Sequence, residues 1–261
     1  MAGLLVIIGL LGLAIGSFLN VVIWRVPRKE SVAHPASHCP QCDAPIEHRD
    51  NIPVVSWVIL RGRCRSCGAR ISVRYPLVEL ATAALFVAFG LHFGIHADLP
   101  AYLYLAAVGV ALTMIDLDLL RLPDALTLPS YPIGLALLGA AAWADNAPHA
   151  YVRALLGMAA LAGFYGLVWL VYPAGMGLGD VKLSGVVGMY LGWLGWGQLL
   201  VGAFAAFVIG AVVSIVVVVG MRGGGRKSRV PFGPFMLIGL LVGIYAGHPL
   251  AHAYTRITSG S

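Results

Sequence analysis

Residues 201–220 read Val-Gly-Ala-Phe-Ala-Ala-Phe-Val-Ile-Gly-Ala-Val-Val-Ser-Ile-Val-Val-Val-Val-Gly, twenty positions without a charged side chain. A helix needs about 20 mostly apolar residues to cross the hydrocarbon of a bilayer. Similar stretches recur along the 261 residues, of which 59% are hydrophobic and 11% charged. That charged share is about half of what soluble proteins carry. The sequence therefore predicts an all-α polytopic membrane protein.

About eight transmembrane helices are expected. The candidate segments cover residues 2–24, 76–96, 101–116, 125–143, 152–172, 182–198, 199–220 and 231–250. Glycines at positions 192, 195 and 197 separate the sixth segment from the seventh, and a single long buried helix is the alternative there. No Lys or Arg precedes the first segment and no small-residue cleavage pattern follows it, so it is interpreted as a permanent anchor.

The basic residues predict the orientation, because Lys and Arg are enriched on the cytoplasmic side of membrane proteins. With the N-terminus outside, 15 of the 17 Lys and Arg residues fall in inner stretches. These stretches are residues 25–75, 116–124, 173–182 and 221–230. The formal charge of +6 then lies mainly on one face. Anionic lipid headgroups are its expected partner, and no nucleic acid is needed to explain it.

The longest polar stretch predicts a small cytoplasmic domain between the first and second helices. The chain is accordingly divided into a first transmembrane helix at 1–24, a cytoplasmic domain at 25–75 and a transmembrane domain at 76–261. All four cysteines lie in the middle part, as Cys39-Pro-Gln-Cys42 and, after a gap of 21 residues, Cys64-Arg-Ser-Cys67.

This cysteine spacing is typical of a structural zinc site with four thiolate ligands. Disulfides are disfavoured in a reducing cytoplasm, and no βαβ pattern surrounds the cysteines as in a thioredoxin-type redox pair. Four thiolates leave no open position for water, so we expect zinc to stabilise a domain too small to bury much core. His38 is the second choice as a ligand.

The chain has only 11 acidic residues, and an acid at membrane depth is a functional candidate. Two clusters lie at the expected inner ends of spans. One holds Asp116, Asp118 and Asp124; the other is Gly175-Met-Gly-Leu-Gly-Asp180-Val-Lys182. Alternate glycines let a backbone unwind and let a substrate strand approach closely. A carboxylate at the end of a span is otherwise often only a hydrated helix terminus.

Asp116 is the first acid after the apolar segment, so it should be the most desolvated of its cluster. Asp118 faces away from it on a helix, and Asp124 is expected to begin the next helix as an N-cap. Glu79, near the start of the second span, is either an interfacial residue or a partner for a buried base. Lys182 either pairs with an acid or extends to the lipid headgroups.

The sequence resembles the prepilin peptidase family. Its members are type IV leader peptidases related to the GxGD membrane aspartyl proteases. The resemblance covers nearly the whole chain. Its motifs are Gly16-Ser-Phe-Leu-Asn20, Ile52-Pro53 to Trp57, Arg61-Gly-Arg-Cys64, Arg74-Tyr-Pro-Leu-Val-Glu79, Asp116 to Asp124, Gly177-Leu-Gly-Asp180 and Pro231-Phe-Gly-Pro-Phe235. It implies that Asp116 and Asp180 are the catalytic pair and that residues 76–261 form the peptidase domain.

The resemblance also implies the reaction and its place in the cell. The substrates would be prepilins of type IV pili or pseudopilins of type II secretion, cut after a basic leader at the cytoplasmic face of a bacterial inner membrane. Gly177, Gly179, Lys182 and Glu79 are tentative substrate-binding residues. Many members of the family also methylate the new N-terminus with S-adenosylmethionine, for which no binding residues are assigned.

Helix dipoles suggest different roles for the two acids. A negative charge is disfavoured at a helix C-terminus, where Asp116 is expected, and favoured at an N-terminus, where Asp180 is expected. The hypothesis is that Asp116 begins as the acid and Asp180 as the base. The alternative function is a multi-pass transporter or membrane scaffold with a zinc-stabilised cytoplasmic domain, which would place facing acids near the bilayer centre.

Overall fold

In this computed structural model of the chain, residues 2–173, 175–220 and 230–259 are described. The basic loop 221–229, counted above among the inner stretches, lies outside the described residues. The described residues form helices and two isolated β-bridges, with no strand. Seven of their helices are long and apolar enough to cross a membrane. The prediction of an all-α polytopic membrane protein is confirmed.

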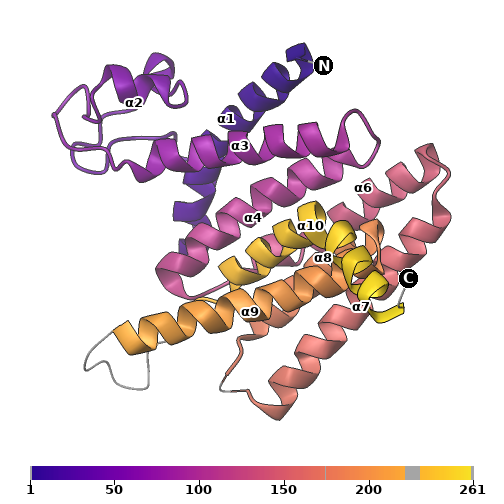
Figure 1. The fold of residues 1–261 in the computed structure, drawn as a ribbon. Coiled ribbons are helices and arrows are strands. Elements are labelled where there is room, and N and C mark those ends of the chain that lie inside the picture. Colours follow the sequence, from indigo (N-terminus) through magenta and orange to yellow (C-terminus); the bar gives the residue numbers. More distant parts are fainter. Residues whose placement is uncertain (1, 174, 221–229, 260–261) are drawn as a thin grey trace. The chain divides into compact units, whose positions relative to one another are not determined.

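The chain forms two compact units, Met1–Ala111 and Leu112–Ser261. In the first unit, α1 (Ala2–Arg25) packs against α3 (Arg74–Phe93). In the sequence, the segment between α1 and α3 holds the cysteines and the short helices η1 (Val26–Arg28), η2 (His48–Asp50) and α2 (Val55–Ile59), of which Figure 1 labels α2. The division of the chain into residues 1–24, 25–75 and 76–261 stays a prediction.

The helix α4 (Leu99–Leu119) carries the chain from the first unit into the second. The second unit continues with α5 (Asp124–Thr127), α6 (Ser130–Ala144), α7 (Pro148–Val171), α8 (Leu178–Leu194), α9 (Trp196–Gly220) and α10 (Gly233–Ser259).

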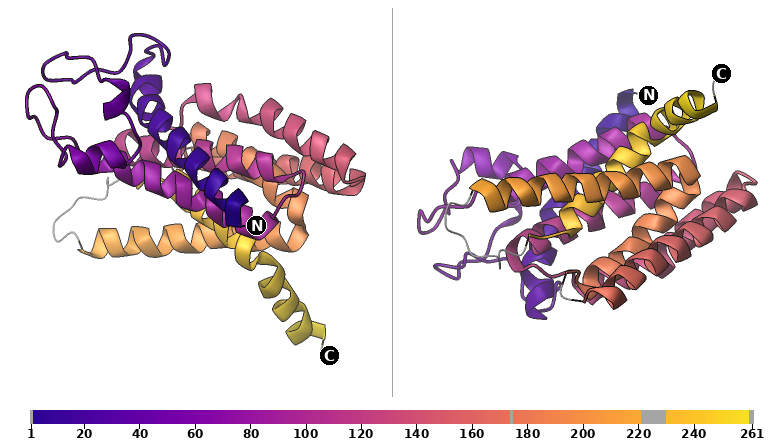
Figure 2. Two further views of the ribbon diagram at one scale, coloured as in Figure 1. Left: turned by 90° about the horizontal axis from the view of Figure 1, so that it is seen from above. Right: turned by 60° about the horizontal axis from the view of Figure 1, so that its bottom comes forward.

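Helix α8 is the core of the second unit. Every residue from Leu183 to Trp193 is buried, because α7, α9 and α10 all pack against this helix (Figure 2). The contact with α7 is close: a Cβ added at Gly188 would overlap the carbonyl oxygen of Gly157. Small residues of this kind allow membrane helices to pack with their backbones in contact. With 17 residues, α8 is shorter than the seven candidate spans.

The break between α8 and α9 settles the alternative of one long helix in favour of two. It falls at Gly195, whose φ of 157° favours glycine, three residues before the expected end of the sixth segment. At this end of α8, the Arg153 guanidinium donates hydrogen bonds to the carbonyl oxygens of Gly192 and Trp193. A cation at a helix C-terminus is stabilised by the helix dipole, so Arg153 helps to fix the position of α8.

Candidate active site

Asp116 lies in the last turn of α4 and is buried, with 5% of its surface exposed. Asp118, two residues later on the helix, is exposed, as the sequence predicted for these two acids. The Asp116 Oδ2 atom accepts a hydrogen bond from the backbone N–H of Gly233, at 3.0 Å, at the start of α10. The carboxylate is thus held between two helices that are far apart in the sequence.

Asp180 lies in the first turn of α8, whose N-cap is Gly177. Its Oδ2 atom accepts a hydrogen bond of 3.1 Å from the backbone N–H of Gly177. An acid at the third position of a helix commonly satisfies this donor, which the helix itself leaves free. The Gly-x-Gly-Asp sequence therefore fixes the Asp180 side chain at the positive end of the helix dipole.

The two carboxylates face one cavity of about 270 Å³. Asp116 is close enough for its charge to act on Asp180. The lining residues are Asp116, Leu120, Arg121, Leu122, Gly177, Leu178, Gly179 and Asp180. The structure thus brings together four of the predicted site residues, Asp116, Gly177, Gly179 and Asp180.

Leu122 explains why glycine stands at two positions around the cavity. A Cβ on Gly179 would lie 2.9 Å from the Leu122 Cβ atom. A Cβ on Gly233 would lie 2.8 Å from Asp116 Oδ2 and 3.2 Å from Leu122 Cδ2. Gly233 lies within the Pro231-Phe-Gly-Pro-Phe235 motif, but its contact with Asp116 was not predicted from the sequence.

Lys182 forms no ion pair with either cavity acid in the part of the chain that the structure describes. Its Nζ atom lies 2.7 Å from Asp124 Oδ1, so Lys182 pairs with Asp124. The expectation that Asp124 is an N-cap is wrong: Pro123 occupies that position, and Asp124 is the first residue of α5. The ion pair joins the first residue of α5 to the second turn of α8.

Glu79 belongs to the first unit, whereas the cavity acids belong to the second. It is buried in α3, and its Oε2 atom accepts a hydrogen bond of 2.7 Å from the backbone N–H of Val54. Val54 has a φ of 61°, an unusual conformation for a β-branched residue. This contact gives Glu79 a structural role, because it holds the strained turn before α2.

The four cysteines come together in the first unit. Their Sγ atoms all lie within 4.8 Å of one another, a spacing that fits one tetrahedral metal ion. The two CxxC segments fold alike. In each, the backbone N–H of the first cysteine donates a hydrogen bond to the carbonyl oxygen of the alanine five residues later. The residue after the second cysteine, Asp43 or Gly68, has a positive φ. The predicted cluster of Cys39, Cys42, Cys64 and Cys67 could therefore hold a metal ion.

The thiols of this cluster differ in how readily they ionise. Backbone N–H groups of Cys67 and Ser66 lower the pKa of the Cys64 thiol to about 7. The Ala44 backbone lowers the pKa of Cys42, but hydrogen bonding to Cys67 and the other nearby thiols raises it to about 12. One thiol thus ionises readily while its neighbour resists, and a bound metal cation would allow all four to act as thiolates.

The fold and the cavity together define a multi-spanning membrane protein with a paired-carboxylate site. Comparison with known proteins identifies the family. Residues 10–93 match the bacterial peptidase A24 N-terminal domain, and residues 103–215 match the type IV leader peptidase family. The chain belongs to the type IV leader peptidase family, which confirms the resemblance seen in the sequence. No solved structure matches the chain.

Named relatives support this assignment over nearly the full length. The type 4 prepilin-like proteins leader peptide-processing enzyme of Escherichia coli O78:H11 is 38% identical, with 90% of this chain and 91% of that protein covered. The prepilin leader peptidase/N-methyltransferase of Aeromonas hydrophila is also 38% identical, over 94% of this chain and 91% of that protein. The enzyme of the same name from Myxococcus xanthus is 40% identical, with 84% of this chain and 64% of that protein covered.

Proposed function

We propose that this protein is a membrane aspartyl endopeptidase that removes the leader from type IV prepilins or type II secretion pseudopilins. The observation that carries the proposal is the cavity shared by Asp116 and Asp180 in a member of this family. Two carboxylates, one ionised and one protonated, can activate water and polarise the carbonyl of a peptide bond. Neither the family nor the cavity favours the alternative of a transporter or scaffold.

In the proposed mechanism, Asp180 is ionised and takes a proton from water, while protonated Asp116 polarises the scissile carbonyl and later protonates the leaving amine. The pair shares one proton and titrates as a unit. Backbone donors orient both carboxylates: Gly233 holds Asp116, and Gly177 holds Asp180. Gly177 leaves exposed backbone beside Asp180, and an extended substrate segment is proposed to bind there, next to Gly179.

The proposed location is a bacterial inner membrane, with the N-terminus outside and the cavity and cysteine domain at the cytoplasmic face. The distribution of Lys and Arg supports this orientation. A prepilin, with a basic leader before an apolar helix, would present its cleavage site at the same interface. Purified protein incubated with a prepilin should yield the leader-free product by mass spectrometry, and an uncleaved precursor would contradict the proposal.

We propose that the metal of the cysteine cluster is zinc and that its role is structural. Zinc would hold the two CxxC turns together; all four ligand positions are filled by Cys39, Cys42, Cys64 and Cys67, so no step of the peptidase reaction passes through it. We expect one zinc per chain in the purified protein and loss of that zinc in Cys64→Ser. Elemental analysis measures both; a wild-type protein without stoichiometric zinc would contradict the assignment.

We also propose that the enzyme methylates the new N-terminus with S-adenosylmethionine, because several relatives carry N-methyltransferase in their names. In that reaction the freed α-amine attacks the sulfonium methyl group, and S-adenosylhomocysteine leaves. Incubation of the enzyme with a prepilin and methyl-labelled cofactor should give a labelled mature product. A mature product without label would restrict the enzyme to cleavage.

The pair Lys182–Asp124 is predicted to set the spacing of the cavity acids. Asp124 comes two residues after Leu122, the last lining residue of the segment that begins at Asp116. Lys182 comes two residues after Asp180. The ion pair therefore joins the two segments that carry the cavity acids. The side chains are 35% and 57% exposed. The pair should therefore add at most about 1 kcal/mol to stability, and its larger effect should be on geometry.

Reversal of one charge, in Lys182→Asp or Asp124→Lys, is expected to lower kcat for leader cleavage about tenfold or more, since small displacements of catalytic groups are costly. The double variant with both charges exchanged restores the attraction and should recover to within about threefold of wild type. Steady-state kinetics measure these values. A double variant no better than the single ones would show that the ion pair has no positioning role.

A further inference from the structure

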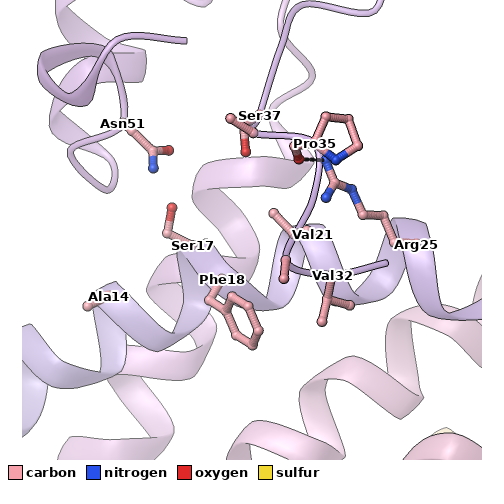
Figure 3. Close-up of a pocket in the computed structure, with 11 residues that line it drawn as sticks. Ala14, Ser17, Phe18, Val21, Arg25, Val32, Pro35, Ser37 and Asn51 are labelled. Atoms are coloured by element: carbon pink, nitrogen blue, oxygen red, sulfur yellow. Dashed lines mark hydrogen bonds between the residues drawn. The ribbon is translucent and has the colours of Figure 1, made fainter. Parts of the chain in front are cut away.

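A second cavity, of about 260 Å³, lies in the first unit between α1 and the loop that follows it (Figure 3). The α1 residues that line it recur at helical spacing, so they form one stripe: Ala14, Ser17, Phe18, Val21 and Arg25. The opposite face of α1 carries Gly12 and Gly16, which contact the backbone of α3. The cavity therefore lies on the side of α1 that α3 does not cover.

Arg25 places a positive charge in this cavity. It is 9% exposed, and its NH1 and NH2 groups donate to the carbonyl oxygens of Ser31 and Pro35, at 2.9 and 2.8 Å. Both partners are neutral, and in the described part of the chain no carboxylate forms an ion pair with Arg25. A guanidinium has five N–H donors, and a buried cation without an anion is unfavourable. An anionic ligand would correct this imbalance.

Three polar side chains from separate segments surround the same space. Figure 3 shows those of Ser17, Ser37 and Asn51 directed towards it. None of the three forms a hydrogen bond with the residues that the structure describes. Two hydroxyl groups and a carboxamide, together with the guanidinium, supply the donors that the oxygen atoms of a phosphate group require.

The rest of the stripe on α1 is apolar and leads away from the cavity towards the middle of the helix. Its exposed members include Ile7, Leu10, Leu11 and Phe18. At the end of α1 that carries Arg25, the guanidinium of Arg28 lies 3.5 Å from the centre of the Trp24 ring. Trp and basic residues mark the interface between membrane and water. These residues beside Arg25 indicate that the cavity is at the level of the lipid headgroups.

We propose that this cavity binds the phosphate headgroup of an anionic phospholipid, with an acyl chain along the apolar stripe of α1. Arg25, Ser17, Ser37 and Asn51 contact the phosphate, and the nearby Arg28 and Lys29 add to the attraction. A bound lipid would hold the loop after α1, and with it the start of the cysteine domain, at the bilayer surface. The inference does not depend on the peptidase activity, because the cavity shares no residue with the Asp116–Asp180 site.

The test is native mass spectrometry of the full-length protein in detergent, titrated with phosphatidylglycerol or phosphatidylcholine. One phosphatidylglycerol should bind at about tenfold lower concentration than phosphatidylcholine. Ser17→Phe fills the polar end of the cavity and should abolish this preference, and Asn51→Leu, in the exposed loop, should weaken it. Ala84→Phe adds the same ring to an exposed position on α3 and should bind as wild type does.

Four results would overturn the proposal. Equal binding of the two lipids would show that the cavity does not select an anion. Displacement of phosphatidylglycerol by inorganic phosphate at similar concentration would identify a site for free anions instead of lipids, and displacement by S-adenosylmethionine would identify a cofactor site. A preference that persists in both Ser17→Phe and Asn51→Leu, with unchanged metal content as the control for folding, would place the lipid elsewhere.

Discussion

Leader cleavage should fall by at least about 1,000-fold when either Asp116 or Asp180 is replaced with alanine, as in other enzymes that lose one member of a catalytic unit. Each variant retains one carboxylate, but that group cannot both accept a proton from water and donate one to the leaving amine. The loss should appear in kcat, because neither acid is proposed to provide the main substrate contacts. Cleavage rates of a purified prepilin measure the effect.

The matched control is Asp118→Ala, which removes an exposed acid from the same helix end and should leave the rate within about threefold of wild type. Zinc content should be the same in all these variants, since the cysteines lie in the other unit. The assignment of roles has its own test. Asn at position 116 can still donate a hydrogen bond to the carbonyl, so Asp116→Asn should retain more activity than Asp116→Ala.

The second large effect is expected from Gly233→Ala. The added Cβ would lie 2.8 Å from Asp116 Oδ2, closer than nonbonded atoms approach, so the carboxylate has to move. Asp116 is buried between α4 and α10, and its movement would disturb the hydrogen bond from the Gly233 N–H. A displacement of about 1 Å at a reacting group typically costs about 100-fold in rate. The expected result is a kcat lower by that factor in leader-cleavage assays.

Gly163→Ala is the control for this substitution. Gly163 lies in α7 of the same unit, and a Cβ there would meet nothing within 4 Å. This variant should cleave at the wild-type rate. If Gly233→Ala were equally active, Asp116 would not depend on the position of the α10 start, and the proposed role of the Gly233 N–H would be wrong.

Local sequence features predicted much of the structure. Runs of apolar residues identified the membrane helices, because the length of a span is set by the bilayer. The CxxC spacing identified four thiols that meet in the structure, because each pair is held by its own tight turn. The ordered motifs identified the family, which the comparisons confirmed. The orientation in the membrane and the catalytic roles stay predictions.

Contacts between distant segments were not predictable in this way. Gly233 lies 117 residues after Asp116, and no periodicity connects the two. Lys182 had several possible partners, and only the packing of α5 against α8 selects Asp124. The role of Glu79 was equally open, since a buried acid that binds a backbone N–H has the same sequence pattern as one that binds a base. The distances between these side chains depend on tertiary packing, which could not be predicted from the sequence of this one chain.

The most direct test of the account is a comparison of wild type and Asp180→Ala, each purified and mixed with the same prepilin, with intact-mass spectrometry of the products. Wild type should give the leader-free pilin, and Asp180→Ala should leave the precursor whole. Leader-free pilin from Asp180→Ala at a rate near that of wild type would contradict the claim that Asp116 and Asp180 form the peptidase site.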